Sequence, residues 1–376
     1  MSTKENILRY LQARKEKTGY RQLSVQNGID FSSNDYLGLS RSALLQQQIK
    51  KAYEQYKYEK SGATGSRLLN GNSILYEKTE QMLAMHHHAP AALMFNSGFD
   101  ANVGLIATVA RNDDIIFYDE LVHASIHQGM KLSGATLVAY KHNDYEDLEI
   151  KIIANSNVKN RFLITESIFS MEGDKADLTI LAKLSNQYSL NFIVDEAHAT
   201  GLFGSKGSGL CNEAGVENYC FARVYTFGKA MGCHGAVVVG EQWLKEYLIN
   251  FSKNFIYTTA LDTHSLLSVE HSYFFIQSIS NQCNKLFLLI NYFNKVKVSL
   301  KHRYIITGTG PIFGVILKGN EQCRLMAVYL QKMGLDIRPI LSPTVPEGTE
   351  RLRVVLHSYN TNEQIDLLFS LLIDYK

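Results

Sequence analysis

A lysine and an aspartate each follow an apolar stretch of the sequence, in surroundings that suit a chemical role. Lys229 lies in the segment Tyr225–Gly232, among glycines and apolar residues that favour burial. A buried lysine loses its charge readily and can act as a Schiff-base amine, whereas an ordinary lysine lies on the surface. Asp195 ends the apolar run Phe192–Val194 in the letters Asp-Glu-Ala-His. An aspartate there is commonly a helix N-cap, but it can also pair with a cation.

Three more polar segments follow apolar runs. His123 comes after the run Ile115–Tyr118 and could stack on a flat ring, although a packed histidine is the commoner case. The glycine turn at 96–98 leads into a helical pattern, and helix N-termini hold phosphates. The segment Thr165–Asp174 adds polar side chains beyond another run. Ligands of open parallel sheets bind beyond the carboxyl ends of the strands, so the five segments predict one site.

Together these residue types meet the requirements of pyridoxal phosphate. Lys229 could form a Schiff base, Asp195 could keep a pyridinium nitrogen protonated, and His123 could stack on the ring. The glycine turn and the helix N-terminus could take the phosphate. The sequence therefore predicts a pyridoxal-phosphate site.

Two other motif interpretations fail. The letters DEAH at 195–198 also occur in helicases, but the chain has no GxxxxGK[ST] phosphate loop. The Thr-x-x-Lys spacing at 226–229 resembles that of acyl enzymes, but neither Ser-Asp-Asn nor Lys-Thr-Gly follows at a useful distance.

The alternation of apolar runs and helical patterns predicts the elements that position these residues. Strands are expected at Ala91–Phe95, Ile115–Tyr118, Leu137–Tyr140, Phe162–Thr165, Phe192–Val194, Val224–Thr226 and Ala236–Val239. Helical patterns lie between several of them, for example at Leu178–Tyr188. Runs that are apolar on both faces and alternate with helices predict an α/β fold, with a mostly parallel sheet covered on both sides.

The two ends of the chain have patterns of their own. An amphipathic helix is expected at 4–17. After residue 285 we expect, in order, a helix at Leu286–Leu300, a strand at Phe313–Leu317, a helix at Cys323–Met333, a strand at Leu352–Leu356 and a helix at Asn362–Ile373. The predicted domains are an N-terminal helix and arm (1–45), a large domain (46–285) and a small C-terminal α/β domain (286–376); packing of the arm with the small domain is implied only by the family resemblance described below.

Composition narrows the function classes. The 376 residues include 38 Lys and Arg against 36 Asp and Glu, a net charge of +2, which gives no electrostatic reason to expect nucleic acid or an anionic membrane as partner. The five cysteines are odd in number and form no CxxC pair, so free thiols and no metal site are expected. The run His86–His88 is expected to be a surface run at a helix end. Residues 1–17 are charged, and no apolar run approaches 18 residues, so a cytoplasmic protein without signal or span is expected.

Longer motifs resemble the α-oxoamine synthases, pyridoxal-phosphate enzymes of fold type I that condense an amino acid with an acyl thioester and release CO2. The motifs run in order nearly end to end: Phe31–Leu39, Gly65–Arg67, Asn96–Phe99, His123–Ser125, Asp195–His198, Thr226–Lys229 and Ser342–Arg353. The resemblance implies a fold-type I transferase with a large domain, whose mostly parallel seven-stranded sheet lies between helices, and a smaller α/β C-terminal domain. It also implies a homodimer with active sites at the subunit interface.

The resemblance also implies roles for single residues. Lys229 would hold the cofactor as a Schiff base, Asp195 would pair with the pyridinium nitrogen, and His123 would stack on the ring and meet the substrate. The phosphate group would be bound by Gly98, Phe99 and Thr226, with Thr258 or Thr259 reaching in from a second subunit. The ring's 3-hydroxyl would be contacted by Ser170 and His198, the amino acid's carboxylate by Asn34 and Arg353, and the acyl substrate by Arg21 and Thr344. For Arg21, a solvated arginine at a helix end is the alternative.

Within the family, the segments Phe31–Ser40, Thr226–Lys229 and Thr344–Arg353 look closest to the members that join L-alanine to a pimeloyl thioester, on CoA or acyl carrier protein, in biotin biosynthesis. In the implied reaction, the amine of Lys229 removes the Cα proton and His198 is a candidate donor to the developing oxyanion. The alternatives are the glycine and acetyl-CoA reaction of 2-amino-3-ketobutyrate CoA ligase, another α-oxoamine synthase, or an aminotransferase on the same fold.

Overall fold

The structure is a computed structural model that describes residues 2–16, 19–23, 25, 27–56 and 62–375. The chain divides by its internal contacts into two compact units. Unit 1 comprises Met1–Tyr36, Ser170–Asp174 and Asn281–Lys376, and unit 2 comprises Leu37–Phe169 and Lys175–Ser280. The domain boundaries predicted from the sequence, at residues 45 and 285, stay a prediction.

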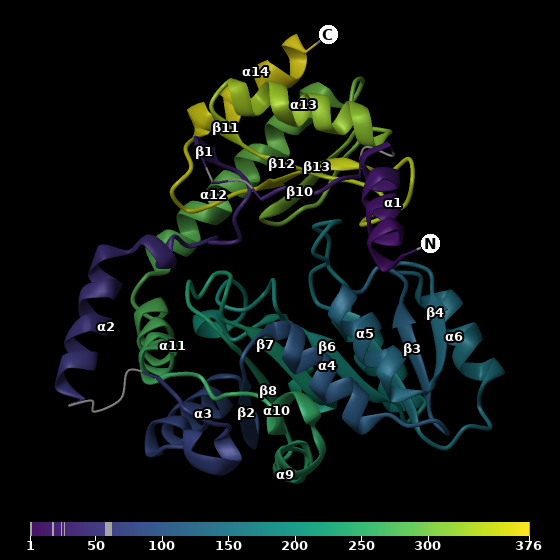
Figure 1. The fold of residues 1–376 in the computed structure, drawn as a ribbon, viewed down its shortest axis with the longest axis vertical. Coiled ribbons are helices and arrows are strands. Elements are labelled where there is room, and N and C mark those ends of the chain that lie inside the picture. Colours follow the sequence, from purple (N-terminus) through teal and green to yellow (C-terminus); the bar gives the residue numbers. More distant parts are fainter. Residues whose placement is uncertain (1, 17–18, 24, 26, 57–61, 376) are drawn as a thin grey trace. The chain divides into compact units, whose positions relative to one another are not determined.

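Unit 2 is built on a seven-stranded sheet with the strand order β2-β8-β7-β6-β5-β3-β4. The strands are β2 (Ala91–Phe95), β3 (Ile115–Asp119), β4 (Thr136–Tyr140), β5 (Arg161–Glu166), β6 (Asn191–Asp195), β7 (Cys220–Thr226) and β8 (Ala236–Gly240). Strand β8 runs antiparallel to β2 and β7, and the pairs from β7 to β4 are parallel. The predicted mostly parallel sheet is therefore confirmed (Figure 1).

Six of the seven strands end within one residue of their predicted bounds, because each is a continuous apolar run. The prediction for β7 was wrong at its start, which lies at Cys220 and not at Val224. The charged Arg223 interrupts the apolar pattern, yet its side chain is buried. The Arg223 guanidinium donates hydrogen bonds to Tyr225 Oη (2.9 Å) and Asn212 Oδ1 (3.0 Å), which compensate the burial of its charge.

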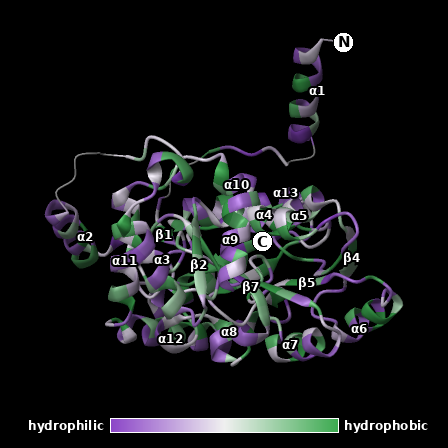
Figure 2. Cartoon of the chain, turned by 90° about the horizontal axis from the view of Figure 1, so that it is seen from below, coloured by the Kyte–Doolittle hydropathy of each residue, from purple (hydrophilic) through white to green (hydrophobic). Residues whose placement is uncertain are grey.

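Helices cover both faces of this sheet. The α-helices of unit 2 are α2 (Ala43–Gln55), α3 (Ile74–His86), α4 (Gly98–Val109), α5 (Ala124–Ser133), α6 (Tyr145–Ala154), α7 (Leu178–Gln187), α8 (Leu210–Glu213), α9 (Gln242–Phe251), α10 (Lys253–Ile256) and α11 (Thr263–Ile276). Short helical turns lie at η1 (Leu39–Arg41), η2 (Arg67–Gly71), η3 (Ser205–Gly207) and η4 (Glu217–Tyr219). Figure 2 shows α4, α9 and α10 on one side of the strands and α7 and α8 on the other. This sandwich explains why β2 and β6 are apolar on both faces.

Unit 1 joins the N-terminal segment to the C-terminal part of the chain. Its elements are α1 (Thr3–Glu16), β1 (Ile29–Asp30), α12 (Ser280–Val296), η5 (Lys297–Leu300), β9 (Ile306–Thr307), β10 (Ile312–Ile316), α13 (Asn320–Lys332), β11 (Leu335–Asp336), β12 (Arg338–Ile340), β13 (Arg351–Val355) and α14 (Asn362–Asp374). Strand β1 pairs in parallel with β11, and β12-β13-β10-β9 form an antiparallel sheet. The helix expected at 4–17 is α1, which buries none of its residues; residue 17 lies outside the described residues.

The histidine run at the end of α3 differs from the prediction, because His87 is fully buried. Its Nδ1 lies 3.0 Å from the Ser208 carbonyl oxygen, its Nε2 lies 2.9 Å from Tyr273 Oη, and its ring stacks on Tyr225 at 3.6 Å. Burial lowers the pKa of His86 to about 4 and holds the pKa of His87 well below its ordinary value. The surface prediction was wrong because the helix end turns this ring into the core, where both ring nitrogens find partners.

Within the described part of the chain, no cluster of three or more His, Cys, Asp or Glu side chains has the arrangement to hold a metal ion. None of the helices in the described ranges combines the length and the apolar character needed to cross a bilayer.

Candidate active site

Asp195 is a buried carboxylate at the carboxyl end of β6, held by neutral donors. Asn102 Nδ2, on α4, donates to Asp195 Oδ2 at 2.7 Å, and the backbone N–H of Ala197 donates to Oδ1 at 2.8 Å. The two hydrogen bonds thus orient both carboxylate oxygens, and neither donor carries a charge. A carboxylate held in this way can still interact strongly with a cationic group.

His123 is the N-cap residue of α5 and lies close to the charges of Asp195 and Lys229. Its Nδ1 accepts the backbone N–H of Ser125 at 3.2 Å and lies 2.8 Å from Ser125 Oγ. His123 is exposed to solvent in part, but the surrounding protein still removes enough water to lower its pKa. Asp195 opposes this shift and the Lys229 charge adds to it, so two of the predicted catalytic residues act electrostatically on a third.

The start of α4 lies directly against the end of β7. The Ser97 hydroxyl caps the helix by accepting the Asp100 N–H at 3.0 Å, which leaves the first-turn N–H groups of Gly98 and Phe99 for another acceptor. A Cβ added at Gly98 would lie only 2.4 Å from Thr226 Cγ2, so the close approach requires glycine. The predicted phosphate residues of helix and strand are therefore neighbours.

Thr258 and Thr259 lie beside this turn in the same chain. Asn96, two residues before Gly98, donates from Nδ2 to Thr258 Oγ1 at 2.9 Å and to the Thr259 carbonyl oxygen at 2.8 Å. Their predicted contact with the phosphate of a second subunit stays a prediction.

Lys229 and His198 both follow strands that end at this edge of the sheet. Lys229 lies half-buried three residues after β7, in a turn closed by a hydrogen bond from the Gly232 N–H to its carbonyl oxygen at 2.9 Å. His198 is buried in the turn that follows β6. Because the parallel strands have their carboxyl ends at one edge, the fold brings together the predicted residues of unit 2.

The predicted amino-acid carboxylate residues belong to unit 1, as does Ser170. Arg353, buried on β13, donates from Nε to the Ser170 carbonyl oxygen at 2.8 Å and from Nη2 to Asn34 Oδ1 at 3.0 Å. Burial raises the pKa of the adjacent Tyr36 to about 12, and the Arg353 charge opposes this rise. The guanidinium is thus oriented by neutral oxygens, a state that suits capture of a carboxylate.

Arg21 and Thr344 are also brought together in unit 1. The Arg21 guanidinium donates from Nη2 to Thr344 Oγ1 at 2.8 Å, across 323 residues of sequence. Arg21 is exposed, so this hydrogen bond agrees with a solvated arginine as well as with a substrate contact, and the role of Arg21 stays a prediction.

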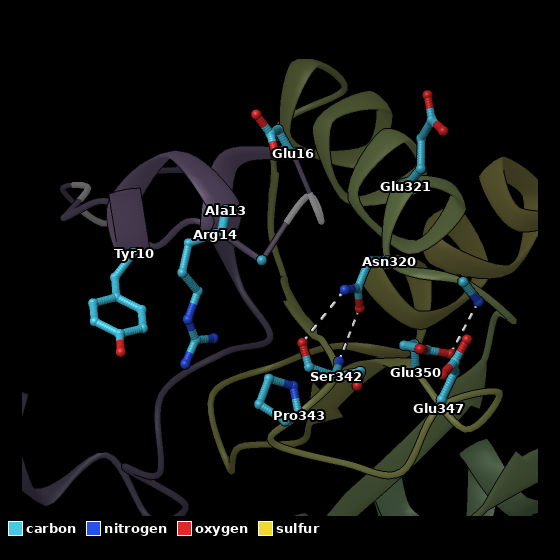
Figure 3. A pocket seen from close by; sticks show the side chains of 12 residues that line it. Tyr10, Ala13, Arg14, Glu16, Asn320, Glu321, Ser342, Pro343, Glu347 and Glu350 are labelled. Atoms are coloured by element: carbon cyan, nitrogen blue, oxygen red, sulfur yellow. Dashed lines mark hydrogen bonds between the residues drawn. The ribbon is translucent and has the colours of Figure 1, made fainter. Parts of the chain in front are cut away.

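A pocket of about 1060 Å³ lies in unit 1, and two of its lining residues, Ser342 and Pro343, directly precede Thr344 in the sequence (Figure 3). It is lined by Tyr10, Ala13, Arg14, Glu16, Gly19, Gly319, Asn320, Glu321, Ser342, Pro343, Glu347 and Glu350. Asn320 fixes one wall, because its Oδ1 accepts the Ser342 N–H at 2.9 Å. Four of the lining side chains are carboxylates and one is a cation, Arg14, so the pocket does not suit a phosphate.

Two side chains that contact the candidate site residues were missed by sequence reasoning. Ser125 ends the motif His123–Ser125, and Asn102 lies four residues after the glycine turn at 96–98, but neither was given a role. The available signal was a single amide among apolar residues, since Ala101, Val103 and Leu105 around Asn102 are all buried. An amide in such a stretch needs a polar partner.

The residues of unit 2 fit pyridoxal phosphate in kind and in placement. Asp195 is a buried carboxylate whose hydrogen-bond donors here are neutral, which suits a pyridinium nitrogen. The half-buried Lys229 suits Schiff-base formation, and Gly98 leaves the start of α4 open against Thr226, which suits a phosphate.

Comparison with known proteins agrees with this chemistry. The model of the aminotransferase class I and II family matches residues 26–370. An 8-amino-7-oxononanoate synthase of Emericella nidulans is 37% identical, over 96% of this chain and 93% of that protein. The structure of an 8-amino-7-oxononanoate synthase from Francisella tularensis has a TM-score of 0.78 at 30% identity, covering 92% of this chain and 96% of that one. The serine palmitoyltransferase of Sphingomonas wittichii has a TM-score of 0.87 at 26% identity, with 98% and 96% covered.

The chain therefore belongs to the aminotransferase class I and II family and, within it, to the α-oxoamine synthases. The relatives from Emericella nidulans and Francisella tularensis are both named 8-amino-7-oxononanoate synthase. The predicted fold-type I transferase fold and the predicted cofactor, pyridoxal 5'-phosphate, are confirmed.

Proposed function

We propose that the protein catalyses the decarboxylative condensation of L-alanine with a pimeloyl thioester, on CoA or acyl carrier protein. The products are 8-amino-7-oxononanoate, CO2 and the free thiol carrier, in biotin biosynthesis. The observation that carries the chemistry is the buried Asp195, held by Asn102 and the Ala197 N–H, with both Asp195 and Lys229 within electrostatic reach of His123. The substrate choice is supported by relatives at 34–37% identity that carry the name of this enzyme.

The residues of unit 2 divide the work on the amino acid. Pyridoxal phosphate, when bound, supplies the electron sink for a carbanion at Cα. The Lys229 Nζ would hold the cofactor, and as a free amine it would take the Cα proton of the amino acid. Asp195 would favour a protonated pyridine nitrogen by its charge, and His123 would contact the ring and the substrate. His198 donates a proton to the oxyanion that forms at the thioester carbonyl.

The remaining predicted residues bind and orient. The cofactor phosphate is assigned to Gly98, Phe99, Thr226, Thr258 and Thr259, and the ring's 3-hydroxyl to Ser170 and His198. The amino acid's carboxylate is assigned to Arg353 and Asn34, whose hydrogen bond at 3.0 Å orients the guanidinium for a second acceptor. Arg21 and Thr344, joined at 2.8 Å, are assigned to the acyl substrate.

A homodimer with active sites at the subunit interface is part of this proposal, as is a cytoplasmic location. Large apolar side chains are exposed on neighbouring elements of unit 2: Leu69 (83% exposed) in η2, Tyr257 (81%) after α10 and Phe99 (49%) on α4. The Ala260 N–H donates to the carbonyl oxygen of Gly65, two residues before η2, at 3.0 Å. Large apolar side chains exposed on neighbouring segments support an interface, and their burial in a dimer is tested by sedimentation of the purified protein.

The mass of the product tests the reaction. Purified protein loaded with pyridoxal phosphate is given alanine with pimeloyl-CoA, alanine with pimeloyl-acyl carrier protein, and glycine with acetyl-CoA in separate reactions. We expect 8-amino-7-oxononanoate from one or both alanine reactions and no product from the glycine reaction. A product from glycine and acetyl-CoA alone would identify 2-amino-3-ketobutyrate CoA ligase instead.

The Lys229→Ala variant tests the assignment of the lysine. We expect the visible absorbance of the covalently bound cofactor and the product to disappear together, because no other residue is assigned to replace the amine. Lys175→Ala, which removes another lysine of unit 2 that lies over the Phe203 ring, should keep both. A Lys229→Ala protein that retained both signals would disprove the assignment.

A further inference from the structure

A continuous chain of hydrogen bonds connects His123 to Asp195 through two buried side chains. Ser125 Oγ lies 2.8 Å from His123 Nδ1 and 3.0 Å from Asn102 Nδ2. Asn102 Nδ2 lies 2.7 Å from Asp195 Oδ2. Ser125 and Asn102 are buried on helices α5 and α4, so the chain runs through the protein interior between the two groups assigned to the cofactor ring.

The chemistry of each atom fixes the direction of this chain. The Asn102 Nδ2 group can only donate, so its two N–H bonds go to Asp195 Oδ2 and to Ser125 Oγ. His123 Nδ1 faces the backbone N–H of Ser125, so this nitrogen must be an acceptor. The Ser125 hydroxyl therefore accepts from Asn102 and donates its own proton to His123 Nδ1. The remaining ring proton of His123 then resides on Nε2.

The unsatisfied atom of Asn102 shows that the amide is held in this orientation. Asn102 Oδ1 is buried and, within the described residues, has no hydrogen-bond partner. Turning the amide over would place this oxygen against the Asp195 carboxylate and remove its donor. The two hydrogen bonds donated by Asn102 Nδ2 offset the free-energy cost of leaving the buried Oδ1 without a partner.

We propose that Asn102 and Ser125 are positioning residues that form a directional relay: Asn102 fixes Asp195 for the pyridine nitrogen, and Ser125 holds His123 as the neutral Nε2–H tautomer. This inference rests on the roles proposed above for Asp195 and His123. It adds that the two roles are set by one network, since the same amide nitrogen serves both. The relay presents His123 to the ring as an uncharged donor and keeps a second positive charge away from Lys229.

The first test measures the affinity for pyridoxal phosphate by titration of the full-length protein. Asn102→Leu has a similar volume but no donors, so we expect its dissociation constant to rise about 10- to 100-fold, as for loss of a hydrogen bond to a charged group. The control is Asn254→Leu, which removes an amide that donates to the Asp100 carboxylate on the same helix at 3.1 Å, and it should bind within about twofold of the wild type.

The Asp195→Asn variant separates this inference from the proposed function. If Asp195→Asn weakens binding but Asn102→Leu does not, the relay is wrong and the role of Asp195 stands. If neither variant weakens binding, the role of Asp195 is wrong, and the inference falls with it. Weakened binding in both variants supports the relay.

The second test needs no cofactor. Nitrogen NMR of the full-length protein with labelled histidine reports which nitrogen of His123 carries the proton, and we expect Nε2–H at neutral pH. Ser125→Ala removes the hydrogen-bond donor that stabilises the neutral ring, so the pH at which His123 titrates should rise by about 0.5 to 1 unit. The other groups that act on His123, namely Asp195, Lys229 and His127, are unchanged in this variant. Ser125→Thr should restore the wild-type value, and Ser133→Ala, at another buried serine of α5, should not change it. A proton on Nδ1 in the wild type would overturn the proposal.

Discussion

Glu80 and Asp195 are both buried carboxylates of unit 2, but the chain treats them in opposite ways. Glu80, on α3, forms ion pairs with the Arg67 guanidinium and with Lys245 Nζ (2.8 Å), and it also accepts the Met94 N–H at 2.9 Å. Asp195 is held by an amide and a backbone N–H. The charge of Glu80 is thus neutralised within the fold, whereas that of Asp195 is oriented and kept for another group.

Two arginines on β13 repeat this difference in unit 1. Arg351 pairs with the Glu172 carboxylate at 3.0 Å, and Arg353 donates to the neutral oxygens of Ser170 and Asn34. A buried ion pair holds structure because loss of one partner leaves an unpaired charge. A buried charge among neutral dipoles is instead prepared for a ligand of opposite charge. Within these two pairs, the partners of the charge, more than its burial, distinguish the structural site from the candidate functional site.

The largest effect on stability is expected from breaking the neutralised site. Glu80→Gln removes the charge that pairs with Arg67 and Lys245, so the free energy of unfolding should fall by about 3 kcal/mol. Activity per folded molecule should stay within a few-fold of the wild type. Denaturant unfolding measures the loss, and Glu77→Gln, at an exposed position of the same helix, should change stability by less than about 0.5 kcal/mol. A large loss of activity in folded Glu80→Gln would contradict the comparison.

Asp195→Asn should show the opposite profile. Removing the charge that faces the cofactor should lower kcat/KM for product formation by about 100- to 1000-fold, the range for loss of one electrostatic contact to a reacting centre. The free energy of unfolding, measured without cofactor, should change by less than about 1 kcal/mol, because no ion pair is broken. Equal losses of stability in Asp195→Asn and Glu80→Gln would show that the two carboxylates do the same work.

The central sheet could be predicted from the sequence because its strands are buried on both faces. Continuous apolar runs such as Ala91–Phe95 identify strands with little ambiguity. The start of β7 was missed because Arg223 reads as a surface residue, although Tyr225 and Asn212 satisfy its guanidinium in the interior. His87 was misplaced for the same reason: polar residues with partners from distant segments can be buried.

The candidate site residues could be predicted because Asp195, Lys229 and His123 each lie within five residues after an apolar run. Roles that depend on three-dimensional partners could not be predicted from the residues alone. The letters Arg351-Leu352-Arg353 do not show which arginine is neutralised, because Glu172 lies 179 residues away. Asn102 gave only the weak signal of an amide in an apolar helix, and its partners Ser125 and Asp195 are also distant in sequence.

The arginine pair offers a matched test of the comparison in unit 1. Lysine keeps the charge but loses the planar fork that binds a carboxylate with two hydrogen bonds. Arg353→Lys should raise KM for alanine about 10- to 100-fold with little change in stability. Arg351→Lys should keep KM within about threefold and lower the free energy of unfolding by about 1 to 3 kcal/mol. Steady-state kinetics with varied alanine, together with denaturant unfolding, measures both variants, and a reversed pattern would refute the assignment of Arg353.

The smallest effect is expected from pH, at a histidine that serves structure only. Burial lowers the pKa of His86 from an ordinary value near 6.5 to about 4, so the unfolded chain takes up a proton at this residue before the folded chain does. The stability due to neutral His86 is therefore complete above pH 6.5 and is lost as the pH falls towards 4. Because the side chain is only partly buried, water reduces this loss to about 1 to 2 kcal/mol.

Denaturant unfolding at several pH values measures the wild type against His86→Phe, which has no proton to gain. As the pH falls from 6.5 towards 4, the free energy of unfolding of the wild type should decrease by about 1 to 2 kcal/mol relative to that of the variant. Parallel pH curves for the two proteins would show that the burial of His86 has no such energetic consequence.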